Sequence, residues 1–204
     1  MSIWNYAYLF PGPLQELNPV GLFDALERLD LEYDQRVIAL KDDGEGHHVE
    51  DETLDNVKKE EVREMLKEKK NLAITCRNRD ISIACYFVIA ASNPHIFLGW
   101  DRRIFESLEE AKQTFYVDGI REAAKKANAV YVVFMVEVPD FFDDRFVDVD
   151  GVRIIDPFLR SGKLAPILEV WVDHSRGGVL PSGVEFYEGQ DLSNGFLSHV
   201  PKIL

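Results

Sequence analysis

The chain has few cysteines, no long hydrophobic run and too few basic residues to balance its acids, and each shortage excludes a class of protein. Its two cysteines, Cys76 and Cys85, lie in apolar, strand-like stretches, so we expect two buried thiols and no disulfide. The longest apolar stretch, 81–91, is too short to cross a bilayer. The first residues lack the basic and apolar regions of a signal peptide. These absences predict a cytoplasmic protein that does not associate with membranes.

The excess of acid is the most unusual bulk property. There are 36 Asp and Glu residues against 23 Lys and Arg residues, which gives a formal net charge of -13. A surface of this sign repels phosphate backbones, so we expect no nucleic-acid partner. It attracts basic proteins and speeds their encounter, although an acidic surface also serves solubility alone. The composition therefore favours a basic protein as the partner.

The chain also lacks the motifs that announce common catalytic and cofactor sites. It contains no Cys-x-x-Cys, His-Glu-x-x-His, Gly-x-Ser-x-Gly or phosphate-binding loop. Residues 173–175, Asp-His-Ser, are the residue types of a hydrolase triad, but neighbours on a strand point to opposite faces and do not line up. The following residues 176–178, Arg-Gly-Gly, could form a small anion-binding nest. We therefore expect no cofactor.

The five histidines are not spaced as metal ligands. His47 and His48 are adjacent in an acidic segment, whereas structural zinc needs spaced ligands on a fixed backbone. His95 and His199 are isolated in the sequence, so core or surface roles are expected for them. The histidines thus predict no metal site.

Apolar periodicity predicts a mixture of helices and strands. The expected helices are 17–31, 54–70 and 107–128, and the expected strands are 3–10, 36–40, 72–76, 81–90, 95–100, 130–138, 167–172 and 184–187. Two connections are hairpins, at 77–80 and at the Asp150-Gly151 turn. Because helices and strands do not alternate regularly, we expect an α+β fold in a single domain, 1–204. Its sheet would be mostly antiparallel or mixed, with about three helices packed on it.

Local signals refine three of these elements. Ser107 and Glu110 have the spacing of a capping box at the start of the last helix. Gly119 is expected to weaken or kink that helix, because glycine is a poor helix former. Residues 130–138 are almost wholly apolar, which predicts a central strand covered on both faces.

Two segments are expected to be irregular. Residues 42–55 hold seven acids and no Lys or Arg, which predicts an acidic mobile loop at about 41–53. The C-terminal tail, about 190–204, has no clear periodicity.

A second acid-rich segment, 137–156, resembles the carboxylate clusters that hold Mg²⁺ in hydrolases. A hairpin that turns at 150–151 would place basic residues opposite two of these acids, which gives them a structural role. The pairing leaves unexplained a group that combines acids with aromatic side chains, as interfaces do. The members of this group are Asp140, Phe141, Phe142, Asp143 and Asp144.

These observations predict a non-catalytic protein-binding module, for example an inhibitor or immunity-type protein that neutralises a basic partner. The acids of the first segment would steer the encounter, and the group at 140–144 would anchor it. The steering residues are Asp42, Asp43, Glu50, Asp51 and Glu52. The alternative is a metal-dependent hydrolase that uses the carboxylates around 140–150.

Overall fold

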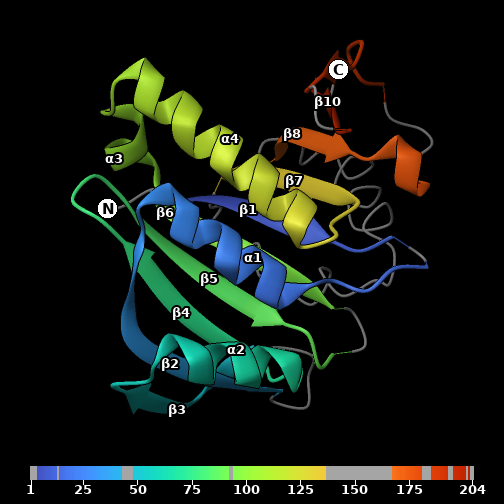
Figure 1. Ribbon diagram of the computed structural model, residues 1–204. Coiled ribbons are helices and arrows are strands. Elements are labelled where there is room, and N and C mark those ends of the chain that lie inside the picture. The colour runs from blue at the N-terminus through green and yellow to red at the C-terminus, as the bar shows by residue number, and fades with distance from the viewer. Residues whose placement is uncertain are drawn as a thin grey trace.

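The computed structural model describes residues 4–12, 14–42, 48–91, 94–136, 167–180, 185–192, 195–200 and 202. In these residues one ten-stranded sheet has the order β3-β2-β4-β5-β6-β1-β7-β8-β10-β9 (Figure 1). The strands are β1 (Trp4–Phe10), β2 (Glu32–Asp42), β3 (His48–Asp55), β4 (Leu72–Arg77), β5 (Ser82–Val88), β6 (His95–Asp101), β7 (Tyr131–Val136), β8 (Ile167–Val172), β9 (Gln190–Asp191) and β10 (Leu197–His199). Every neighbouring pair is antiparallel. The predicted α+β single-domain fold is confirmed.

Helices cover one face of this sheet. They are α1 (Pro19–Leu26), α2 (Lys59–Lys67), α3 (Arg102–Glu106) and α4 (Glu110–Lys126), with the short 3-10 helices η1 (Glu27–Leu29) and η3 (His174–Arg176). Helices α1 and α4 run side by side in front of the sheet, and α2 lies over β2 (Figure 1). Their buried side chains form the main core with the strand residues that face them. Among the described residues, no helix is long and apolar enough to cross a membrane.

Alternation along the strands divides the sheet into two apolar faces. Leu9 of β1 points to the helices and is fully buried, whereas its neighbour Tyr8 lies on the face away from the helices, here called the opposite face. On β7, Val132 belongs to the main core and Val133 to a second cluster on the opposite face. This double burial confirms that 130–138 contains a central strand covered on both faces.

Gly119 lies where α4 approaches η1 most closely. A Cβ at this position would stand 1.9 Å from Leu29 Cδ2, so only glycine fits without a shift of its neighbour. Helix α4 is continuous through Gly119, so close packing is the reason for this glycine. The predicted capping box is wrong, because the Ser107 hydroxyl donates to the Ile104 carbonyl (2.6 Å) and ends α3. The N-cap position of α4 is Glu109.

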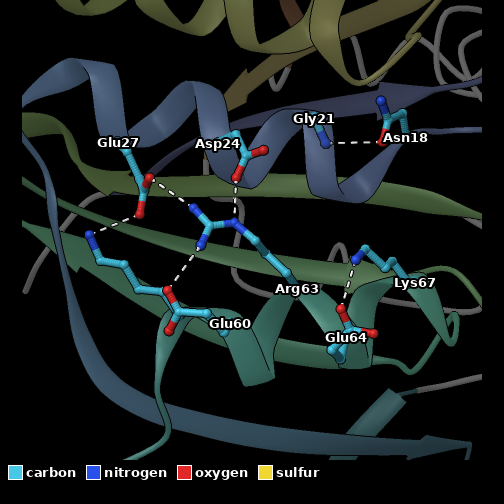
Figure 2. A network of polar contacts seen from close by, with 9 residues as sticks. Asn18, Gly21, Asp24, Glu27, Glu60, Arg63, Glu64 and Lys67 are labelled. Atoms are coloured by element: carbon cyan, nitrogen blue, oxygen red, sulfur yellow. Dashed lines mark hydrogen bonds and ion pairs between the residues drawn. The ribbon is translucent and has the colours of Figure 1, made fainter.

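Arg63 of α2 bonds to α1 through its guanidinium group (Figure 2). Its Nε donates to Asp24 Oδ1 (2.8 Å), and its Nη2 donates to Glu27 Oε2 (3.1 Å). Nη1 lies 3.7 Å from Glu60 Oε1 on α2 itself. The guanidinium carbon lies 5.6 Å from the centre of the Phe23 ring, which is a cation–π contact. One side chain thereby joins two helices that are more than thirty residues apart in sequence.

The acidic segment is a strand, so the predicted mobile loop at 41–53 is wrong in extent. Strand β2 continues to Asp42, and β3 pairs with it from His48 to Asp55, with a register shift between Ala39 and Leu40. Helix α2 accordingly begins at Lys59 and not at residue 54. Charged side chains are tolerated on β3 because they point into water, while pairing with β2 satisfies the backbone groups. Residues 43–47 lie outside the described part of the chain.

The C-terminal region is also more regular than expected. Two short strands, β9 and β10, lie within the segment 190–204, and β10 pairs with β8. Of the strand predicted at 184–187, the described residues 185–187 form a short β-bridge, in which the Tyr187 amide donates to the Val200 carbonyl (3.0 Å) and the Lys202 amide donates to the Glu185 carbonyl (2.9 Å). The hairpin predicted around Asp150-Gly151 lies outside the described residues.

The two cysteines lie in diagonal positions on neighbouring strands of the core, where Cys76 pairs with Ile83 and Cys85 pairs with Ile74. Cys76 on β4 and Cys85 on β5 are both buried and free, which confirms that they are packing residues. Burial raises the pKa of the Cys85 thiol well above its ordinary value, and the neighbouring Cys76 thiol adds to the rise. A thiol held protonated in this way is a poor nucleophile.

Candidate functional site

The most exposed charged element is the acidic hairpin, defined here as β2 and β3. Strand β3 is at one end of the strand order, and its side chains are exposed from residue 49 to residue 53. Leu54 alone of its residues packs against the main core. Its acidic side chains are Glu50, Asp51, Glu52 and Asp55. Strand β3 therefore presents four carboxylates on a paired backbone at the edge of the sheet.

Few cations neutralise these carboxylates. Lys41 Nζ lies 2.6 Å from Asp51 Oδ1, and the contact between Arg36 and Asp55 is long, at 4.0 Å. Both ion pairs are exposed to solvent, where such pairs contribute little. Within the described part of the chain, no Lys or Arg lies within ion-pair distance of Glu50 or Glu52. The surface of the hairpin is thus negative on balance.

Four of the predicted binding residues lie together on this hairpin. Asp42 ends β2 opposite His48, and Glu50, Asp51 and Glu52 follow on β3. The other predicted residues lie outside the described part of the chain, as do the carboxylates around 140–150 of the hydrolase alternative. These residues are Asp43, Asp140, Phe141, Phe142, Asp143 and Asp144.

The opposite face carries a row of apolar side chains that begins on β2 of the hairpin. Strand register places Ile38, Ala73, Tyr86, Phe97 and Tyr8 in line across five strands. The rings of Tyr86 and Phe97 stack with their centroids 4.2 Å apart. Ile38, Tyr86 and Phe97 are half-buried, whereas Tyr8 is buried. Tyr86 and Phe97 are thus partly exposed on the opposite face, two and three strands away from β2.

Tyr86 connects this row to the acids. It lines a shallow hollow of about 80 Å³ together with residues of β2 and β4, including Arg36 and Thr75. Burial raises the pKa of the Tyr86 hydroxyl, and the negative charge of Glu50 raises it further. An aromatic surface bordered by carboxylates is suited to contact a partner that is both basic and apolar.

Residues 173–175 do not form a triad, although His174 and Ser175 lie on η3 and not on a strand, with Asp173 at the N-cap. The buried Asp173 side chain accepts from the Ser175 hydroxyl (2.5 Å) and from the Arg176 amide (3.2 Å). Ser175 therefore contacts the acid and not the histidine. The predicted anion nest is also wrong, since the Gly177 amide donates to the His174 carbonyl and the Gly178 amide to the Asp173 carbonyl, both at 3.1 Å.

His174 instead faces His199, and these two residues are called the histidine pair. The Nε2 atoms of the two rings lie 3.5 Å apart, and the ring planes are nearly perpendicular. His174 Nδ1 lies 2.8 Å from the Gly178 carbonyl oxygen. His199 is buried on β10, and burial lowers its pKa, with a further contribution from His174. Sequence reasoning missed the pair because β10, which positions His199, was not predicted.

A separate hollow of about 540 Å³ lies between the β4–β5 turn and α4. Four of the polar side chains that line it are hydrogen-bonded in pairs. Lys112 Nζ donates to Asp80 Oδ2 (2.8 Å), and the Asn78 amide donates to the Tyr116 hydroxyl (3.0 Å). These contacts give the four residues a structural role.

No family model matches the chain, and no curated protein is detectably similar to it. The function is therefore inferred from the geometry and charge of the described residues.

Proposed function

We propose that this protein is a non-catalytic protein-binding module that engages a basic protein through the acidic hairpin. The observation that carries the proposal is the position of β3 at the end of the strand order, with its acidic side chains exposed and only two of the four, Asp51 and Asp55, within ion-pair distance of a cation among the described residues. Carboxylates arranged in this way attract a positive surface over about 10 Å at moderate salt. They also repel other acidic molecules, including a second copy of this chain.

Charged residues on an edge strand have a protective role as well, because they prevent strands of other chains from pairing with the edge. Protection alone does not require a single sign of charge. On β3 all the charged side chains apart from its single histidine are negative. An edge of one sign still admits a strand or loop of the opposite sign, so the charge pattern supports selection of a basic partner.

The half-buried Tyr86 and Phe97 supply the apolar part of such an interface. Acidic rims steer a partner, whereas aromatic side chains near the centre of an interface contribute most of the binding energy. An inhibitor or immunity-type protein that covers the basic surface of a toxin or nuclease is the concrete form of this proposal. The acidic composition of the chain supports it.

The test compares three versions of the full chain as baits in affinity capture from the native cell lysate. The hairpin variant is Glu50→Gln/Glu52→Gln. The matched control is Glu109→Gln/Glu110→Gln, which removes two equally exposed charges at the start of α4, away from the hairpin. We expect a basic protein to be retained stoichiometrically by the wild type and the control, and to be released at moderate salt. The hairpin variant should retain less of it.

Two outcomes would contradict the proposal. If the hairpin variant retains the same partner as well as the wild type does, the hairpin is not the binding surface. If no basic protein is retained at low salt, the binding function itself is unsupported. An increase in melting temperature with millimolar Mg²⁺ or Mn²⁺ would then favour the metal-dependent hydrolase.

A further inference from the structure

We propose that the histidine pair, His174 and His199, binds a divalent transition-metal ion of the Zn²⁺ or Ni²⁺ class. This site is on η3 and β10, at the other end of the sheet from the acidic hairpin, and it does not depend on the proposed function. The argument rests on the tautomer of His174, the distance between the rings and the rigidity of the support.

The hydrogen bond to Gly178 determines the tautomer of His174. A carbonyl oxygen only accepts, so the Nδ1 atom that lies 2.8 Å from it must carry the proton. In the neutral ring, Nε2 then has a free lone pair directed at His199. Histidines that bind metals are commonly oriented in this way, by donation from the other ring nitrogen to a backbone carbonyl. His174 thus already has the hydrogen bond of a metal ligand.

The distance between the two Nε2 atoms fits two bonds to one metal ion. Two Zn–N bonds of about 2.0–2.1 Å at a tetrahedral angle place their nitrogens roughly 3.4 Å apart. The observed separation is 3.5 Å. For a hydrogen bond between two ring nitrogens this distance is long, since N–H donors prefer about 2.9–3.0 Å. The separation therefore suits a shared ion better than a shared proton.

The pair is held in place and can be reached from solvent. His199 is buried, and its ring lies against Gly189, where a Cβ would stand 2.5 Å from His199 Cε1. The ring of Phe186 packs edge-on against the same imidazole, with the two ring centroids 6.0 Å apart. The His174 side chain is exposed, so an ion can enter from its side. A rigid ligand beside an accessible one is an arrangement that binds a metal without large rearrangement.

Among the described residues, no third His, Cys, Asp or Glu joins the pair to form a larger metal-binding group. Water would therefore occupy the remaining positions of a tetrahedral ion, as it does the open position of a catalytic zinc site. Such a site binds more weakly than a structural zinc centre and exchanges its ion readily. It is also open to a further ligand from another molecule.

The test is a calorimetric titration of the untagged full chain with Zn²⁺ at neutral pH. We expect one ion per chain, with shifts of the two Nε2 resonances in imidazole ¹⁵N NMR spectra. His174→Gln and His199→Gln should each weaken binding roughly tenfold or more, the scale of changes close to a metal ion. The matched control, His47→Gln/His48→Gln, removes the adjacent histidines of the acidic segment and should leave the affinity unchanged.

Absence of Zn²⁺ binding to the wild type would overturn the proposal. So would an affinity that survives His174→Gln, or one that is lost in the control. Circular dichroism and melting temperature check that each variant folds. His174 is exposed, so its variant decides the test even if replacement of the buried His199 disturbs the fold.

Discussion

Gly119→Ala tests whether α4 and η1 are packed at the closest possible distance. In an exposed helix, alanine in place of glycine stabilises by about 1 kcal/mol. Here the new methyl group would stand 1.9 Å from Cδ2 and 2.8 Å from Cγ of the buried Leu29, so the whole end of that side chain must shift. An extra methyl group in a well-packed core lowers the free energy of unfolding by about 1–3 kcal/mol. Because this overlap is severe, we expect a cost of about 2–3 kcal/mol. We expect a net loss of about 1–2 kcal/mol in the free energy of unfolding.

A double-mutant cycle identifies the cause of this loss. Leu29→Ala alone should cost about 2–5 kcal/mol because it leaves a cavity. The methyl group of Gly119→Ala fits into that cavity, so the double variant should be more stable than the sum of the single effects by about 1–3 kcal/mol. Gly21→Ala is the matched control, because its Cβ would meet the backbone oxygen of Lys126 at 2.4 Å. Leu29→Ala should not rescue Gly21→Ala.

Equilibrium unfolding in urea measures all of these variants, with the midpoint compared at constant slope. Two results would refute the reasoning. The first is a Gly119→Ala variant that is more stable than the wild type, which would mean that helix propensity outweighs the overlap. The second is additivity of Gly119→Ala and Leu29→Ala, which would mean that the two residues do not compete for the same space.

Two further predictions concern ion pairs between helices and turns. Arg63→Lys keeps the positive charge but loses the two-pronged guanidinium that bonds to both Asp24 and Glu27. We expect the free energy of unfolding, measured in urea, to fall by about 1 kcal/mol. An unchanged unfolding midpoint would contradict this. The hydrogen bond from Lys112 lowers the pKa of the Asp80 carboxyl in the folded protein. The ionised Asp80 therefore stabilises the fold fully above its unfolded-state pKa of about 3.9, and this contribution is lost as the pH falls through the lower folded-state pKa. The melting temperatures of wild type and Lys112→Met should therefore differ at neutral pH and converge in acid; a constant difference would refute this.

Strands that are buried on the sheet were predictable from the sequence. Residues 167–172 coincide with β8, and 72–76 and 95–100 differ from β4 and β6 by one residue at one end. Each is a short apolar run whose side chains enter a core on one face or on both. Burial imposes the composition of such strands, so the composition identifies them.

Strands formed by pairing alone could not be predicted in this way. Strand β3 consists mainly of exposed, charged residues, and its extended conformation comes from hydrogen bonds to β2. Strand β10 has three residues and depends on β8 in the same manner. The misplaced cap at Ser107 has a similar origin, because α3 is too short to leave a periodic pattern. In each case the conformation depends on pairing with another strand, or the signal is only one turn long.

The same distinction affects how the candidate sites work. The acids of the hairpin were expected on a mobile loop, where a partner would have to order the chain as it binds, at about 1–2 kcal/mol per residue for the backbone. On β3 this entropy is already lost in folding, and Glu50 lies close enough to Tyr86 for its charge to raise the pKa of the Tyr86 hydroxyl. A fixed pattern of charge beside an aromatic surface can discriminate between basic partners, whereas a mobile acidic loop attracts all of them. In the proposed interaction, the strand conformation of the hairpin is therefore what would turn a general attraction to positive charge into a basis for specificity.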